Sequence, residues 1–260
     1  MGNCSSREDF FEHFGFLIPE IYRVLMPGRE VAVHCMNLPD TIERQGHIGI
    51  YDFRGDIIRA FQKHGFIFHA EVCIWKDPLL AAVRTKALGL AHKQIVKDST
   101  MCRPGIPDYL CVFRKPGINP IPVPHEHGFT KDVFIGEDAP KETGMKKSHN
   151  TWRRYASPIW TDIRQSRVLK VAAAREEKDE KHICPLQLDV IDRGLTLWSN
   201  PGEIVFSPFA GIGSEGYCAV LAGRKFLGFE LKDAYAAVAG RNLAQAEKEY
   251  SEIDSRLLEG

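Results

Sequence analysis

Apolar positions in the first 115 residues alternate between a helical period and a β period. A helical period runs through residues 10–25 and again through residues 53–61, and Gly65 ends the second of these predicted helices. Between and after them lie runs rich in β-branched and aromatic residues. These runs predict three strands: EVAVHC (30–35), FIFHAEVCIW (66–75) and DYLCVFRK (108–115).

The pattern is lost in the middle of the chain and returns near the C-terminus. Residues 116–150 show no period and are dominated by prolines, glycines and charges, which predicts a linker or mobile loop region. Helical and β patterns then alternate again in four segments: a helix in 183–199, the strand EIVFS (203–207), a helix in 214–222 and the strand KFLGFEL (225–231), before a last helix. This alternation on both sides of an irregular middle predicts an α/β sheet with helices on its faces.

The composition limits the class of protein but does not indicate a function. The chain has 260 residues, 44% of them hydrophobic, which is enough for one domain or one domain with an insertion. Its formal net charge is zero, so attraction to nucleic acid would need local basic patches. The seven cysteines are scattered, and neither a signal peptide nor a membrane span is visible, so we expect a cytoplasmic protein with no membrane partner.

A glycine loop carries the clearest chemical signal. VFSPFAGIGSEG (205–216) places Gly211, Gly213 and Gly216 at G-x-G-x-x-G spacing between a predicted strand and a predicted helix. Glycines let the backbone approach a ligand closely, and Glu230, at the end of the next strand, can accept hydrogen bonds from ribose hydroxyls. Two ligands fit: a dinucleotide such as NAD, or S-adenosylmethionine. An NAD domain needs further βα units after Glu230, whereas 30 residues remain, so we expect a permuted order with the cofactor half last.

In that order the sequence resembles the β-type amino-group DNA methyltransferases, and in particular the DNA methylases of phages and prophages. SPFAGIGSEGYCAVLAGRKFLGFELKDAYAAVAGRNL (207–243) is similar to their cofactor motif, D-P-F-x-G-x-G, and to the G-R-x-x-x-G-x-E strand that follows it. HICPLQLDVIDRGLTLWSNPGEIV (182–205) is similar to the helix before that motif. PGREVAVHC, the helix after it and FIFHAEVCIWKDP are similar to elements of the catalytic half.

The resemblance implies a fold, a reaction and a cofactor site. The fold is a Rossmann-like sheet in permuted order, with a catalytic half in 1–115, a linker and target-recognition region in 116–163 and a cofactor-binding half in 164–260. The reaction is methyl transfer from S-adenosylmethionine to the exocyclic amino group of adenine, or of cytosine, in double-stranded DNA. The implied cofactor-binding residues are Ser207, Pro208, Phe209, Ala210, Gly211, Gly213, Glu230, His182, Pro185 and Leu186. Ser207 stands where the family usually has Asp, so we expect weaker cofactor binding.

The family's catalytic motif, [D/S/N]-P-P-[Y/F/W], has no match, because the sequence contains no Pro-Pro dipeptide. In the family this motif holds the target amino group and stacks on a flipped base just upstream of the first helix. The nearest match is Ser157-Pro158-Ile159-Trp160, which fits a packing or DNA-contact element better than a substitute. We therefore expect a truncated reading of a longer gene. The alternative is that a partner, such as the second subunit of a homodimer, supplies the missing strands.

Two basic segments are candidates for DNA contact. Residues 76–115 hold eight Lys or Arg against three Asp, and residues 141–154 hold five against one Glu. Such side chains give affinity for phosphates rather than sequence choice, and an aromatic-basic cluster also suits unstacked bases. For any single basic residue an ordinary solvated face is the alternative. The candidates are Arg84, Lys86, Lys93, Arg103, Trp152, Arg153 and Arg154.

Other chemistries find less support. His34-Cys35 and His182-x-Cys184 do not have zinc spacing, so we expect no metal. Two further functions stay open at this stage. One is an inactive cofactor-binding or DNA-binding fragment, which the missing motif suggests. The other is an NAD-dependent oxidoreductase, which the glycine spacing alone suggests.

Overall fold

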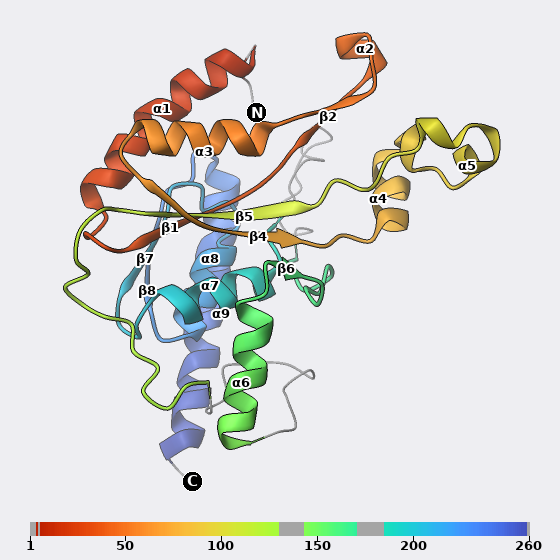
Figure 1. Cartoon of the computed structure of the whole chain (residues 1–260). Coiled ribbons are helices and arrows are strands. Elements are labelled where there is room, and N and C mark those ends of the chain that lie inside the picture. The colour runs from red at the N-terminus through yellow and green to blue at the C-terminus, as the bar shows by residue number, and fades with distance from the viewer. Residues whose placement is uncertain (1–3, 5, 130–142, 171–184, 259–260) are drawn as a thin grey trace. The chain divides into compact units, whose positions relative to one another are not determined.

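The computed structural model describes residues 4, 6–129, 143–170 and 185–258 (Figure 1). The chain forms two compact units. The first contains residues 1–122 and 150–162, and the second contains residues 123–149 and 163–260. The three-part division predicted at residues 115 and 163 stays a prediction.

A four-stranded sheet forms the centre of the first unit, in the order β1-β5-β4-β6 (Figure 1). Its strands are β1 (Glu30–Met36), β4 (Ile67–Ile74), β5 (Asp108–Arg114) and β6 (Ile159–Trp160). β5 runs antiparallel to both neighbours, and β6 pairs in parallel with β4. The three strands predicted from the sequence are confirmed, and β6 is an addition within the segment predicted as linker and recognition region.

Two helices, α1 (Arg7–Val24) and α3 (Phe53–Lys63), accompany this sheet. The ring of Phe61 on α3 stacks on Phe113 of β5, with 4.2 Å between the ring centroids, and Phe14 of α1 contacts Phe61. On the opposite face of β5, Leu110 and Val112 are also buried. Because both faces of β5 are covered, its sequence is an almost continuous apolar run instead of an alternating one.

Two excursions leave this sheet. The first is a hairpin of β2 (Leu38–Asp40) and β3 (Gly49–Tyr51), with the short helix α2 (Ile42–Gln45) between its strands. The second lies between β4 and β5 and contains α4 (Pro78–Thr85), η1 (Leu88–Leu90), α5 (Lys93–Lys97) and η2 (Ser99–Met101). The sequence of this stretch indicated only a long basic segment. Its helices are short, so they carry no long apolar period, and the apolar side chains of α4 are not buried.

The second unit contains the predicted elements around a βαβ core: α7 (Leu188–Trp198), β7 (Ile204–Ser207), α8 (Ser214–Leu221), β8 (Lys225–Gly228) and α9 (Asp233–Leu258). β7 and β8 are parallel and α8 connects them. Apolar residues of α7 and α8 form one buried cluster: Leu188, Ile191, Leu195, Cys218 and Ala219. This cluster fixes the helix that precedes β7 against the helix that follows the glycine loop.

The predicted irregular region is partly helical. Residues 144–155 form α6 (Gly144–Tyr155), so the prediction of a linker without regular structure is wrong at residues 144–150. The sequence there, GMKKSHN, is polar and has no apolar stripe that would have indicated a helix. Residues 130–142 of the predicted linker lie outside the described residues.

Candidate functional site

The glycine loop joins β7 to α8 and holds two left-handed glycines with different surroundings. Gly211 has φ 53° and Gly213 has φ 84°, conformations that side chains rarely adopt. A Cβ on Gly213 would lie 3.1 Å from the Cβ of Ala239 in α9, so Gly213 permits close packing. A Cβ on Gly211 would meet no atom within 4 Å, so the backbone at Gly211 faces open space. Gly211 is therefore the point where a ligand can approach the main chain.

Glu230 is held beside this loop by backbone donors. The N–H of Gly211 donates to Oε2 of Glu230 at 2.9 Å, and the N–H of Lys232 donates to Oε1 at 2.9 Å. The main chains next to Gly211 and Glu230 are also hydrogen-bonded to each other, because Ala210 N–H donates to the carbonyl of Phe229 at 2.8 Å. Each carboxylate oxygen keeps a lone pair for a further donor. The structure thus brings together the two residues whose spacing the sequence analysis singled out.

Exposed apolar side chains lie next to both residues. Phe209, two positions before Gly211, is 66% exposed, and Phe229 and Leu231, on either side of Glu230, are 60% and 99% exposed. Ser207 and Ala210 are buried, and Pro208 is half-buried. Phe229 and Leu231 are not among the site residues predicted from the sequence. β8 ends at Gly228, so Glu230 follows the strand instead of ending it as predicted, and the exposure of its two apolar neighbours depends on the fold.

The segment before α7 is fixed by an ion-pair cluster that sequence analysis also missed. Arg164 donates two hydrogen bonds to the carboxylate of Asp189, at 3.0 and 2.6 Å, and Arg167 donates to Asp189 at 2.6 Å and to Asp192 at 2.5 Å. Burial by itself raises the pKa of Asp189, but the hydrogen bonds and charges of Arg164 and Arg167 outweigh burial and lower this pKa to about 2. Leu186 packs on the cluster of apolar residues between α7 and α8. Pro185 is half-buried, and His182 lies outside the described residues.

Ser157-Pro158-Ile159-Trp160 makes the contacts of a sheet edge. The Ser157 hydroxyl donates to the carbonyl of Ile159 at 2.7 Å, and the carbonyl of Pro158 accepts from Cys73 N–H of β4 at 2.9 Å. The Trp160 side chain is 1% exposed, and its Nε1–H donates to the carbonyl of Tyr155. The polar side chain and the ring that would hold a target base are therefore engaged within the fold.

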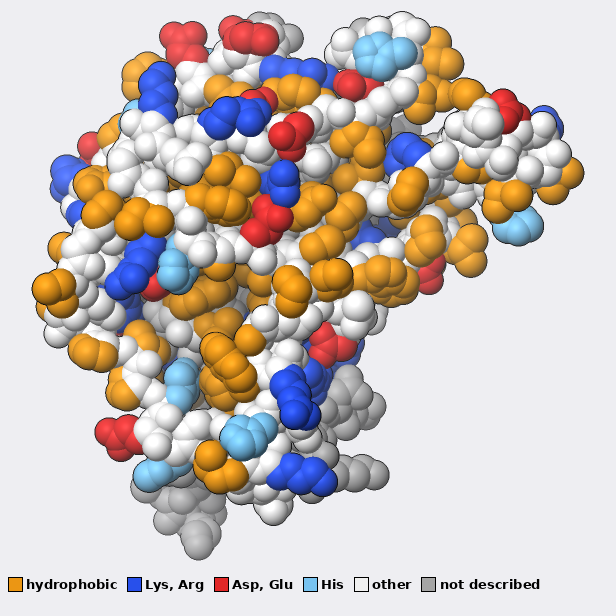
Figure 2. All heavy atoms as spheres, in the orientation of Figure 1, with side chains coloured by type: hydrophobic (Ala, Val, Ile, Leu, Met, Phe, Trp, Pro, Cys, Tyr) orange, Lys and Arg blue, Asp and Glu red, His pale blue; other side chains and the backbone are white. Residues whose placement is uncertain are grey.

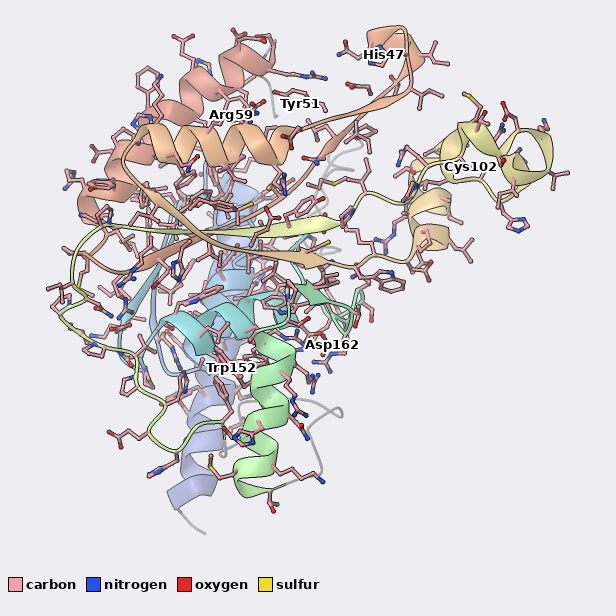
Figure 3. The ribbon with its side chains drawn as sticks, viewed as in Figure 1. His47, Tyr51, Arg59, Cys102, Trp152 and Asp162 are labelled. Atoms are coloured by element: carbon pink, nitrogen blue, oxygen red, sulfur yellow. The ribbon has the colours of Figure 1, made fainter. Side chains whose placement is uncertain are left out.

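The basic candidates divide into two groups. Arg84, Lys86 and Lys93 are exposed on the excursion between β4 and β5, and Arg103 is half-buried there. Trp152, labelled in Figure 3, and Arg153 are exposed on α6. Arg154 donates two hydrogen bonds to Oδ2 of Asp162, at 2.9 and 2.7 Å, so its charge is already paired within the first unit.

A second charged cluster lies at one end of the four-stranded sheet. Asp108 is 3% exposed and lies 3.2 Å from Nε2 of His34 and 2.5 Å from Nζ of Lys76. Burial raises the pKa of Asp108, but His34 and Lys76 together lower it below the ordinary value. Lys76 is thus committed to Asp108 and is not available as a DNA contact.

Two functional features are not found in the part of the chain that the structure describes. There, no group of three or more His, Cys, Asp or Glu side chains is arranged to hold a metal ion. None of the described helices combines the length and the apolar composition needed to cross a membrane.

Comparison with known proteins identifies the class. A model of the DNA methylase family matches residues 1–241, and the chain therefore belongs to the DNA methylase family. This confirms the resemblance drawn from the glycine loop and its flanking segments.

Curated relatives match over short segments. DNA adenine methyltransferase YhdJ of Escherichia coli (strain K12) is 47% identical over 45 residues, which is 17% of this chain and 15% of that protein. Type II methyltransferase M.BamHI of Bacillus amyloliquefaciens is 30% identical over 88 residues, which is 34% of this chain and 19% of that protein. The matches thus span less than a fifth of the length of these curated relatives.

Solved structures match over most of the chain. A Thermus thermophilus protein assigned as a DNA modification methylase, in complex with S-adenosyl-L-methionine, has a TM-score of 0.64 at 21% identity, covering 92% of this chain and 78% of that one. The PvuII DNA methyltransferase, which is cytosine-N4-specific, has a TM-score of 0.58 at 14% identity, covering 100% of this chain and 80% of that one. These similarities confirm the predicted α/β methyltransferase fold.

Proposed function

We propose that the protein transfers a methyl group from S-adenosylmethionine to the exocyclic amino group of adenine, or of cytosine, in double-stranded DNA. Membership of the DNA methylase family supports the reaction class. One observation carries the assignment of the site: the N–H of Gly211 donates to Glu230 at a point where the backbone faces open space. An NAD-dependent oxidoreductase, suggested by glycine spacing alone, has no support from the family.

The residues at the loop fit S-adenosylmethionine. Glu230 retains lone pairs for the two ribose hydroxyls, because its backbone donors occupy one site on each oxygen. Phe209, Phe229 and Leu231 offer exposed apolar surface for the adenine ring. The open backbone at Gly211 admits the polar chain of the ligand. Ser207 brings no negative charge to the cofactor's ammonium group.

S-adenosylmethionine, when bound, supplies a methyl group that its sulfonium already activates. The amino nitrogen of the base forms a bond to the methyl carbon while the carbon–sulfur bond breaks, its electron pair stays on sulfur, and a proton leaves the nitrogen. The work left to the protein is to hold the two reactants in line and to exclude water. The loop residues Ser207–Gly213 and Glu230 would hold one reactant, and no metal takes part in this scheme.

The DNA contacts belong to the same proposal. Trp152 and Arg153 on α6 are exposed and are placed to contact unstacked bases or phosphates. Arg154 is a weaker candidate because Asp162 pairs with it.

We also propose that the protein acts in the cytoplasm. A homodimer is the proposed assembly, and sedimentation would measure its mass.

Methyl transfer tests the proposal. The chain is incubated with labelled S-adenosylmethionine and unmethylated genomic DNA, and the modified nucleoside is identified. N6-methyladenine or N4-methylcytosine supports the proposal and names the base. Cofactor binding without incorporation would instead favour a cofactor-binding or DNA-binding protein that does not catalyse by itself. Reduction of NAD in place of methyl transfer would contradict the proposal.

A further inference from the structure

Residues 77–105, between β4 and β5, form a segment with regular structure of its own, which we call the arm (Figure 1). Its two limbs meet at a narrow neck, where a Cβ on Gly105 would lie 3.8 Å from Pro78. The returning limb is tied to η1, because Arg103 N–H donates to the carbonyl of Gly89 at 3.0 Å. Gln94 is buried within the arm and donates to the carbonyl of Asp98. The arm therefore holds its own shape.

The arm carries positive charge that the fold does not neutralise. Residues 77–105 contain five Lys or Arg against two Asp, a formal charge of +3. Its acids are used as helix caps: Asp77 accepts from the N–H groups of Leu79 and Leu80, and Asp98 accepts from the N–H and hydroxyl of Thr100. Within the described residues, none of the five basic side chains of the arm forms an ion pair: Arg84, Lys86, Lys93, Lys97 and Arg103.

The same arm exposes large apolar side chains. On α4, Leu79 is 64% exposed and Val83 is 76% exposed, and the two lie four residues apart on one face of the helix. On α5, Val96 is 83% exposed. Figure 2 shows hydrophobic side chains (orange) beside charged ones on the surface of the arm, and Figure 3 labels Cys102 on its returning limb. No residue of α4 is buried, so this helix packs little of its surface against the rest of the first unit.

We propose that the arm is a nucleic-acid-binding element separate from the glycine loop. Arg84, Lys86, Lys93 and Lys97 would contact backbone phosphates, and Leu79 and Val83 would contact sugars and base edges in a groove. Phosphate contacts supply affinity without sequence choice, and apolar side chains beside basic ones are a known way to enter a DNA groove. That the nucleic acid is duplex DNA rests on the proposed function.

The charge of the arm indicates whether its partner is DNA or a second copy of the chain. Contact between two arms would bring unpaired positive side chains together, and like charges across an interface are costly. A polyanion has the opposite effect, since each phosphate contact also releases a counterion. The combination of unpaired basic side chains and capped acids therefore favours DNA over self-association.

Binding of the full chain to a fluorescein-labelled duplex, measured by anisotropy at several salt concentrations, tests the arm. The Lys86→Ala/Lys93→Ala/Lys97→Ala variant should weaken binding about tenfold or more and lower the slope of log affinity against log salt by about 2 to 3. Lys63→Ala/Lys225→Ala/Lys248→Ala is the matched control, because it removes the same charge from exposed positions outside the arm. The control should keep the wild-type slope.

An apolar variant separates the two kinds of contact. Leu79→Ser/Val83→Ser should weaken duplex binding several-fold while the salt slope stays unchanged, because no charge is removed.

Wild-type affinity and slope in the lysine variant, or absence of duplex binding by the wild type, would overturn the arm proposal. So would a loss of dimer mass in Leu79→Ser/Val83→Ser, by sedimentation, with DNA affinity intact. Binding of S-adenosylmethionine, titrated in the same samples, reports the glycine loop independently, so failure of the arm is distinguishable from failure of the proposed function.

Discussion

The N–H of Gly211 donates a 2.9 Å hydrogen bond to Oε2 of Glu230, a residue 19 positions further along the chain. Oε1 of the same carboxylate accepts from Lys232 N–H, at the start of the segment that leads into α9. The conformation of the glycine loop and the position of the acid therefore depend on each other. A ligand that bonds to Glu230 necessarily lies beside the open backbone at Gly211.

Replacing Glu230 should weaken cofactor binding more than it weakens the fold. Glu230→Gln keeps one acceptor oxygen but loses the charged hydrogen bonds, and we expect S-adenosylmethionine affinity to fall about 10- to 100-fold, as measured by calorimetry. Glu203→Gln is the matched control, since Glu203 also accepts from a backbone N–H, that of Asn200 at 2.8 Å, in a turn before β7. Equal loss of affinity in both variants would assign Glu230 a structural role alone.

The two glycines should separate ligand contact from packing. Gly211→Ala places a methyl group in open space, so it should cost about 1 kcal/mol of stability for the left-handed backbone and lower cofactor affinity at least about tenfold. Gly213→Ala adds a clash with Ala239 and should lower stability by about 2 kcal/mol or more. Urea unfolding and calorimetry measure the two effects. Unchanged cofactor affinity in Gly211→Ala would place the ligand elsewhere.

Ser207 stands at the buried end of β7. An aspartate there would gain an ion pair with the cofactor's ammonium group, so Ser207→Asp should bind S-adenosylmethionine about tenfold more tightly. Without ligand the same variant should be less stable by about 1 to 3 kcal/mol, because it buries an unpaired carboxylate. Ser207→Asn, which is similar in shape and uncharged, should show no gain. Wild-type affinity in Ser207→Asp would refute this account of the serine.

The cluster around Asp189 predicts acid sensitivity of the second unit. The pKa of Asp189 in the folded chain is about 2, below its value in an unfolded chain, because Arg164 and Arg167 outweigh the effect of burial. A lowered pKa stabilises the fold above about pH 4, and this contribution, about 2 kcal/mol, is lost as pH falls toward 2.

Urea unfolding at several pH values checks this prediction. Asp189→Asn should be less stable than the wild type at pH 6, with a deficit that shrinks as pH falls from 4 toward 2. Glu247→Gln, which changes an exposed carboxylate on α9, should follow the wild-type profile. A deficit independent of pH would show that Asp189 contributes through its shape instead of its charge.

Periodicity predicted the long elements but not the short ones. β1, β4 and β5 and the helices α3, α7 and α8 follow clear apolar patterns, because each buries one or both faces. α4 buries no residue and α6 is polar, so no long apolar period indicated them. Asp77 and Pro78 are nevertheless a cap and a first-turn proline that could have marked the start of α4. The order β1-β5-β4, with β5 between strands that precede it, depends on pairing between distant segments and cannot be deduced from local pattern.

The candidate site likewise contains some features that the sequence predicted and others that only the structure reveals. Gly211 and Glu230 were predicted because a fixed spacing links them, whereas the pairing of Arg164 with Asp189 joins residues 25 positions apart and has no such spacing rule. Ser157-Pro158-Ile159-Trp160 resembled a motif by residue type, but only the structure reveals that Trp160 is buried and that the Pro158 carbonyl belongs to the sheet. Exposure of Phe229 and Leu231 likewise depends on the fold.

Direct titration of the chain with S-adenosylmethionine and, separately, with NAD, each by calorimetry, tests the central claim most directly. The account predicts that one S-adenosylmethionine binds per chain, that Glu230→Gln weakens this binding while Glu203→Gln does not, and that NAD gives no heat of binding. NAD binding without S-adenosylmethionine binding, or S-adenosylmethionine binding that is insensitive to Glu230, would contradict it.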